Sequence, residues 1–167
     1  AGEGVSIGGD SPREHGGLMQ EPREAFNSST VLVTLGANSH FNTFNLTGGG
    51  NLSRYQAFIT FAGEHSRVET NGVNLLNGTQ HGDTTLFLDH AVPNCSSREI
   101  FRAVVDERGH SVFQGRIIVR PKARKTAAKM RTRAPLLSDA REAADKPELD
   151  TCPDHVTASA AVATRRP

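Results

Sequence analysis

The chain has 167 residues, 36% of them hydrophobic and 22% charged, so it is sized for one domain, or a piece of one, with enough apolar content to bury a core. Its formal net charge of +1 gives no field that would favour nucleic acid or an anionic membrane, and no apolar run is long enough to cross a bilayer. The two cysteines, Cys95 and Cys152, are too few for a disulfide framework, so we expect a chain of the reducing cytoplasm, without nucleic acid or membrane as a partner.

The first zone covers residues 1–29 and is rich in Gly, Glu, Arg and Pro. It shows no sustained apolar period and therefore has little to bury. We expect an irregular or disordered segment here.

Short apolar segments separated by turn residues follow, and we interpret them as β-strands. Alternate residues in several of them are apolar, as in Tyr55, Ala57, Ile59 and Phe61, which places one face of the strand inward. Asn, Gly and Pro between the segments supply the backbone angles that tight turns need. The expected strands span residues 30–35, 40–47, 53–61, 67–76, 80–90, 98–105 and 110–120.

This spacing of short strands fits either an antiparallel β-sandwich or a stacked β-solenoid. No strict sequence repeat separates the two. The chain is therefore predicted to be all-β, and the residue pattern leaves its architecture open.

The last zone begins near Lys122 and is less regular and less hydrophobic. It opens with a run of cations that could follow a phosphate backbone, but the chain has only 5% aromatic residues and no Trp to stack on bases. A solvated basic face is the favoured interpretation. The run consists of Lys122, Arg124, Lys125, Lys129, Arg131 and Arg133.

One strand and the turn after it carry side chains of the types that bind iron or zinc: His81, Asp83, Asp89, His90 and Cys95. In an extended strand the first three share one face while His90 points to the other, so they do not converge locally. Surface or packing roles are favoured over a metal site. A metal-dependent enzyme that uses His81, Asp83 and His90 is kept as an alternative.

The phosphate-binding signature of ATPases is missing from the sequence. There is no GxxxxGK[ST] phosphate loop, so we expect no ATP hydrolysis by this chain, and we expect no direct catalysis either. Five tripeptides match the N-glycosylation pattern, beginning at Asn27, Asn45, Asn51, Asn77 and Asn94. They support a second alternative, a secreted, glycosylated β-sandwich binding module with a Cys95–Cys152 disulfide.

Longer motifs follow one another along the chain in the order LGANSHFNTF, GGGNLSR, LLNGTQHGDTT, DHAVPNCSSRE, VFQGRIIVRPKARKTAAK, LLSD and KPELD. This ordered set resembles the SufB/SufD family of iron–sulfur cluster assembly proteins, and its SufD members more closely. The resemblance implies a right-handed parallel β-helix, with a SufD-like core at residues 30–157 and a divergent tail at 158–167. It also implies that the chain is an interior piece of a longer protein.

The resemblance implies a non-catalytic scaffold subunit that forms a heterodimer with a SufB-like protein through the last strands. ATP would be bound by a SufC-like ATPase, which would dock on helices that this chain lacks. The iron–sulfur cluster would be present only transiently, at the complex. The exposed terminal strands also suggest a homodimer through the same edge.

The chain departs from the family pattern near its end. The Cys and His that SufD sequences carry near the cluster site fall at Ala158 and Ala160, which cannot bind iron or sulfide. Cys152 and His155 lie nearby but out of register, so the ligand role is not transferred to them.

Overall fold

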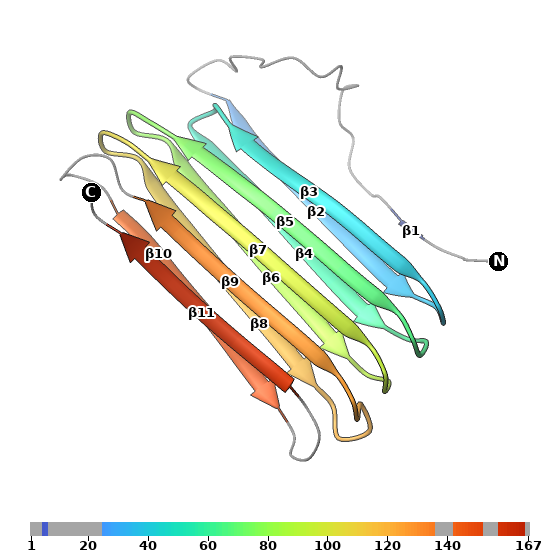
Figure 1. Cartoon of the computed structure of the whole chain (residues 1–167). Helices are drawn as coiled ribbons and strands as arrows, with labels where there is room; N and C mark the ends of the chain where they lie inside the picture. Colours follow the sequence, from blue (N-terminus) through green and yellow to red (C-terminus); the bar gives the residue numbers. More distant parts are fainter. Residues whose placement is uncertain (1–4, 7–24, 136–141, 152–156, 166–167) are drawn as a thin grey trace.

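The computed structural model describes residues 5–6, 25–135, 142–151 and 157–165. Apart from the short β1, its strands form two parallel sheets packed face to face (Figure 1). The strands are β1 Val5–Ser6, β2 Phe26–Leu35, β3 His40–Gly48, β4 Leu52–Phe61, β5 Arg67–Leu76, β6 His81–His90, β7 Ser96–Val105, β8 His110–Val119, β9 Ala127–Pro135, β10 Glu142–Thr151 and β11 Thr157–Arg165. No helix that could span a membrane occurs in these ranges.

Successive strands alternate between the two sheets. One sheet has the order β1-β2-β4-β6-β8-β10, which we call sheet A, and the other has the order β11-β9-β7-β5-β3, which we call sheet B. Each coil of the chain thus adds one strand to each sheet and pairs in parallel with the coil before it. This is a β-solenoid, which confirms the β-helix. The antiparallel sandwich is wrong, because only β1 pairs antiparallel to its neighbour.

The core fills the space between the sheets. In β4 the inward residues Tyr55, Ala57, Ile59 and Phe61 are all buried, as the alternation predicts. Equivalent positions stack from coil to coil, so Phe61 lies in register with His90 of β6. Parallel in-register stacking converts a period-2 pattern within each strand into continuous columns of buried side chains.

The corners continue the hydrogen-bond ladder of the sheets. Ala62 donates its backbone N–H to the carbonyl of Leu35 (2.9 Å), and Arg120 donates to His90 (3.0 Å). Asn38 and Asn94 adopt positive φ at two corners, as expected for Asn in a tight turn. The turn residues therefore let each coil repeat the path of the one below it.

The structure differs from the expectation at both ends. Residues 26–29, assigned to the irregular first zone, belong to β2, and Val5–Ser6 pairs antiparallel with it as β1. The last zone contains β9, β10 and β11, and β11 crosses the expected boundary between 157 and 158. Backbone pairing explains the difference, because each of these strands is in register with the coil before it. Residues 1–4 and 7–24 of the first zone lie outside the described residues.

Candidate functional site

The two carboxylates predicted on β6 lie on the outer face of sheet A. Asp83 accepts a hydrogen bond from Arg54 Nε on β4 (3.0 Å). Asp89 accepts two from Arg120, at 2.9 Å from Nε and 2.5 Å from a terminal nitrogen. Both carboxylates are thus paired with cations of a neighbouring coil, which fits the surface role favoured from the sequence.

His81 also lies on this outer face, and its ring stacks on that of His110 in the next coil. The ring centroids are 4.7 Å apart with an interplanar angle of 15°. Partial burial, followed by the charge of His110, lowers the pKa of His81. The two imidazoles stack because they occupy the same register position on β6 and β8.

His90 lies on the opposite face of β6 from His81, as the alternation predicts, and the structure places that face in the core. Its ring stacks on Phe61, with centroids 4.2 Å apart, and its Nε2 shares a hydrogen bond with Ser97 Oγ (3.0 Å). Burial lowers the pKa of His90 to about 4, with Asp89 acting weakly in the opposite direction. The imidazole is therefore neutral at pH 7.

Cys95 is buried at the corner before β7. Its thiol donates hydrogen bonds to the carbonyls of Pro93 (3.4 Å) and Gly63 (3.5 Å). Burial raises the pKa of the thiol, which keeps it protonated and a poor metal ligand. The proposed partner in a disulfide, Cys152, lies outside the described residues.

These candidates do not form one site. His81 and Asp83 face outward while His90 faces the core, so the trio proposed for a metal-dependent enzyme is divided between two faces of β6. Within the ranges that the structure describes, no three His, Cys, Asp or Glu residues are placed to hold a metal ion.

Glu99 on β7 is a site residue that the sequence analysis missed. Its side chain is 0% exposed, and neither carboxylate oxygen has a hydrogen-bond partner. Burial raises its pKa to about 8. Ser97, which shares a hydrogen bond with His90 Nε2, lies two residues before Glu99 on the same buried face of β7. The phase of alternation in β7 could have identified Glu99, since it shares a face with Phe101, Ala103 and Val105.

The family model for the SUF system FeS cluster assembly SufBD core domain matches residues 5–166. The chain belongs to the SufB/SufD family. Among similar curated proteins, an iron–sulfur cluster assembly SufBD family protein of Synechocystis is 27% identical over 93% of this chain and 34% of its own length. The iron–sulfur cluster assembly protein SufD of Escherichia coli is 28% identical over 80% of this chain and 31% of its own length.

A SufBD family protein of Mycobacterium leprae is also similar, at 28% identity over 73% of this chain and 33% of its own length. This SufB/SufD chain therefore spans about a third of the curated relatives that it matches. The description of the matching family and the names of these relatives refer to iron–sulfur cluster assembly.

The register between strands shows where Ala158 and Ala160, the two positions at which this SufB/SufD chain departs from the family pattern, lie relative to the buried Ser97 and Glu99. Ala158 pairs with Ala128, which pairs with Ser97, and Ala160 pairs with Met130, which pairs with Glu99. The two positions thus continue the columns of Ser97 and Glu99 into the last coil. A methyl group at Ala160 offers no atom that could bind a metal.

The last coil also presents two open strand edges. β10 is the end strand of sheet A and β11 the end strand of sheet B, and within the described part of the chain no further strand pairs with them. Unpaired backbone N–H and C=O groups along such an edge favour pairing with another chain. This edge is the candidate functional surface.

Proposed function

We propose that this chain is a SufD-type, non-catalytic scaffold subunit of iron–sulfur cluster assembly that pairs with a SufB-like protein. Membership of the SufB/SufD family and the similarity to a protein named SufD support this role. The observation that carries the pairing is the open edge of β10 and β11, strands of 10 and 9 residues at the same end of the solenoid. A partner strand added there would extend both sheets.

In this proposal the chemistry belongs to the partners. Ala160 stands where SufD sequences carry a histidine, so the ligands of the nascent cluster come from the SufB-like subunit. The cluster is the cargo of the complex and stays only transiently, and ATP is bound by a SufC-like ATPase. The cytoplasm is the compartment in which we place this assembly.

Backbone geometry gives a sharp test of the edge. Thr157 donates its N–H to the carbonyl of Thr126 (3.0 Å), so this residue faces β9. Since backbone groups alternate sides along a strand, Ala161 also bonds to β9, whereas the N–H of Ala160 points to the open edge. Ala160→Pro therefore removes a donor from the edge alone, and Ala161→Pro removes one from the internal ladder.

The experiment is anaerobic co-expression of the chain with a SufB-like and a SufC-like protein, followed by affinity purification and iron and sulfide analysis. The wild type should recover the SufB-like partner. Ala160→Pro should recover at least about tenfold less of it while keeping the thermal stability of the wild type, and Ala161→Pro should lower that stability. Equal recovery of the partner by wild type and Ala160→Pro, with both folded, would refute pairing through this edge.

A further inference from the structure

The outer face of sheet B carries a concentration of positive charge on two adjacent strands. Every charged side chain that points outward from β7 and from β9 is cationic, and all of these side chains are exposed. In register, Arg98 lies opposite Lys129, and Arg102 lies opposite Arg133. We call this set the basic face: Arg98, Arg102, Lys129, Arg131 and Arg133.

The cations of sheet A are arranged differently. There, Arg54, Arg116 and Arg120 each form an ion pair with a carboxylate of an adjacent coil. Among the described residues, no member of the basic face has such an ion pair. The only outward carboxylate on the described strands of sheet B, Glu69, is hydrogen-bonded to Arg67 and lies in register with Arg98. The other four cations of the basic face have no carboxylate in register on a neighbouring described strand.

Like charges placed opposite each other on neighbouring strands destabilise a sheet. Two such pairs, Arg98 with Lys129 and Arg102 with Arg133, lie side by side on β7 and β9. An anionic partner would relieve this repulsion when it binds, so the unfavourable arrangement in the free chain favours a docking role.

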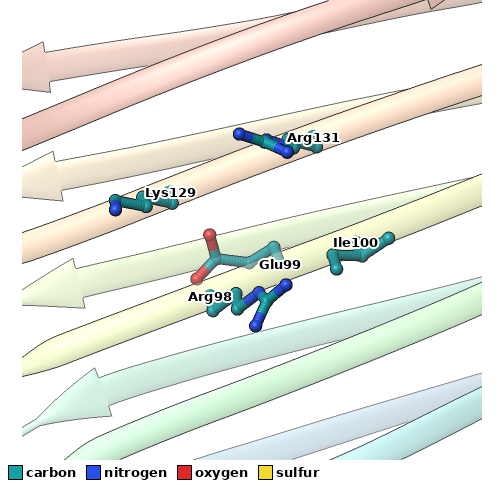
Figure 2. Close-up of a pocket in the computed structure, with 5 residues that line it drawn as sticks. All are labelled: Arg98, Glu99, Ile100, Lys129 and Arg131. Carbon is teal, nitrogen blue, oxygen red and sulfur yellow. The ribbon is translucent and has the colours of Figure 1, made fainter.

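The centre of the basic face is hollowed. A depression of about 290 Å³ is lined by Arg98, Glu99 and Ile100 of β7 and by Lys129 and Arg131 of β9 (Figure 2). Ile100 stands between the cations of the two strands, since its register partner on β9 is Arg131. The hollow has room for more than one protruding side chain.

Apolar side chains continue this outer face toward β3. Phe44 and Leu46 of β3 are 62% and 57% exposed, and Leu75 of β5 is 42% exposed. Their outward positions are linked to the basic face by register, because Leu46 pairs with Val73, which pairs with Arg102. Sheet B thus presents cations and apolar groups side by side.

We propose that the outer face of sheet B docks an acidic polypeptide segment of a partner protein that also carries apolar side chains. Its carboxylates would neutralise the five cations, and its apolar residues would cover Ile100, Phe44 and Leu46. Nucleic acid fits less well. Phe44 is the only aromatic residue among these exposed groups on which a base could stack, and phosphates make no favourable contact with the exposed leucines. A hollow that can receive protruding side chains favours a polypeptide over a lipid surface.

The test uses the 167-residue chain and a synthetic peptide with alternating blocks of Glu and Leu, with binding measured by fluorescence anisotropy. Arg98→Glu/Arg131→Glu is compared with Arg108→Glu/Lys122→Glu, which makes the same charge change at exposed corner positions. The first variant should bind at least about tenfold more weakly than the wild type, and the second should bind nearly as well as the wild type. Higher salt should weaken wild-type binding.

Three further probes make the proposal falsifiable. A peptide with Ser in place of Leu tests how much the apolar side chains contribute to binding. It carries the same charge as the Glu/Leu peptide and should bind more weakly than that peptide. A single-stranded oligonucleotide and vesicles rich in phosphatidylserine test the other anions. Equal binding of the Glu/Ser peptide, tighter binding of the oligonucleotide or the vesicles, or unchanged peptide affinity in Arg98→Glu/Arg131→Glu would overturn the proposal.

Discussion

At the scale of single residues, Glu99 and His90 determine how stability responds to pH. Both are buried without a charged partner in the core, and both stay neutral at pH 7 because burial penalises the charged form. A lowered histidine pKa removes stability as pH falls from 6.5 toward about 4. A raised carboxyl pKa has the opposite sign and removes stability as pH rises.

We predict that Glu99→Gln stabilises the chain at alkaline pH and has little effect in acid. Below pH 4.5 the carboxyl is protonated in the folded and the unfolded state, whereas between 4.5 and about 8 only the folded state keeps the proton. The wild type therefore loses stability relative to Glu99→Gln across this range, by up to about 5 kcal/mol above pH 8. Urea unfolding from pH 4 to about pH 9 measures the difference.

The control for this prediction is Glu64→Gln, which removes a carboxylate whose side chain is half exposed at a corner. Its unfolding free energy should run parallel to that of the wild type. A constant difference between Glu99→Gln and the wild type at all pH values would mean that the pKa of Glu99 is the same in the folded and unfolded states, which would contradict the prediction.

Single residues of β6 also show which features of the candidate site could be predicted from the sequence. Sequence reasoning placed Asp83 and His90 on opposite faces of the strand correctly, because the alternation of β6 is regular. Asp89 is only 6% exposed although it lies on the outer face, since Arg120 of the next coil covers it. That contact depends on the register between coils, which no local pattern contains.

At the scale of elements, the strands of the central coils were predicted to within a few residues, because apolar alternation and Asn or Gly corners agree there. β10 was not predicted: five of its ten residues are charged and it contains Pro147. β11 is rich in alanine and has little β-propensity of its own. Both strands form because each pairs with the coil before it, and this pairing is invisible in their own residues.

Packing between strands predicts a contrast between two glycines of sheet B. A Cβ at Gly72 would lie 2.4 Å from Cε1 of Phe101, whose ring packs against Phe113. Gly48 has no atom within 4 Å of the same position. Gly72→Ala should therefore cost about 1–3 kcal/mol of unfolding free energy, and Gly48→Ala should change it by less than about 0.5 kcal/mol.

Thermal and urea unfolding of the two variants would measure this contrast. The double variant Gly72→Ala/Phe101→Leu serves as a rescue, because a smaller side chain makes room for the added methyl group. If Gly72→Ala is as stable as Gly48→Ala, the ring of Phe101 can move aside and the column is not tightly packed.

At the scale of the whole molecule, β10 and β11 form the last coil of the solenoid in the part of the chain that the structure describes, and no further described strand pairs with them. Val162 of β11 is 45% exposed, and residues 159–163 are exposed throughout. A two-fold pairing of β11 with β11 of a second copy would cover this edge. The same edge would then serve either a homodimer or a heterodimer, and the two would compete.

We predict that the isolated chain forms a dimer whose population rises with concentration. Val162→Lys should shift the equilibrium toward monomer by at least about tenfold, because a charged side chain on an edge strand opposes pairing. Asn42→Lys adds the same charge at an exposed position on β3, at the other end of sheet B, and should leave the dimer unchanged. Sedimentation velocity over a range of concentrations measures the three proteins side by side. A wild type that stays monomeric at the highest concentration would count against pairing through β11, and a dimer lost equally in both variants would place the contact elsewhere.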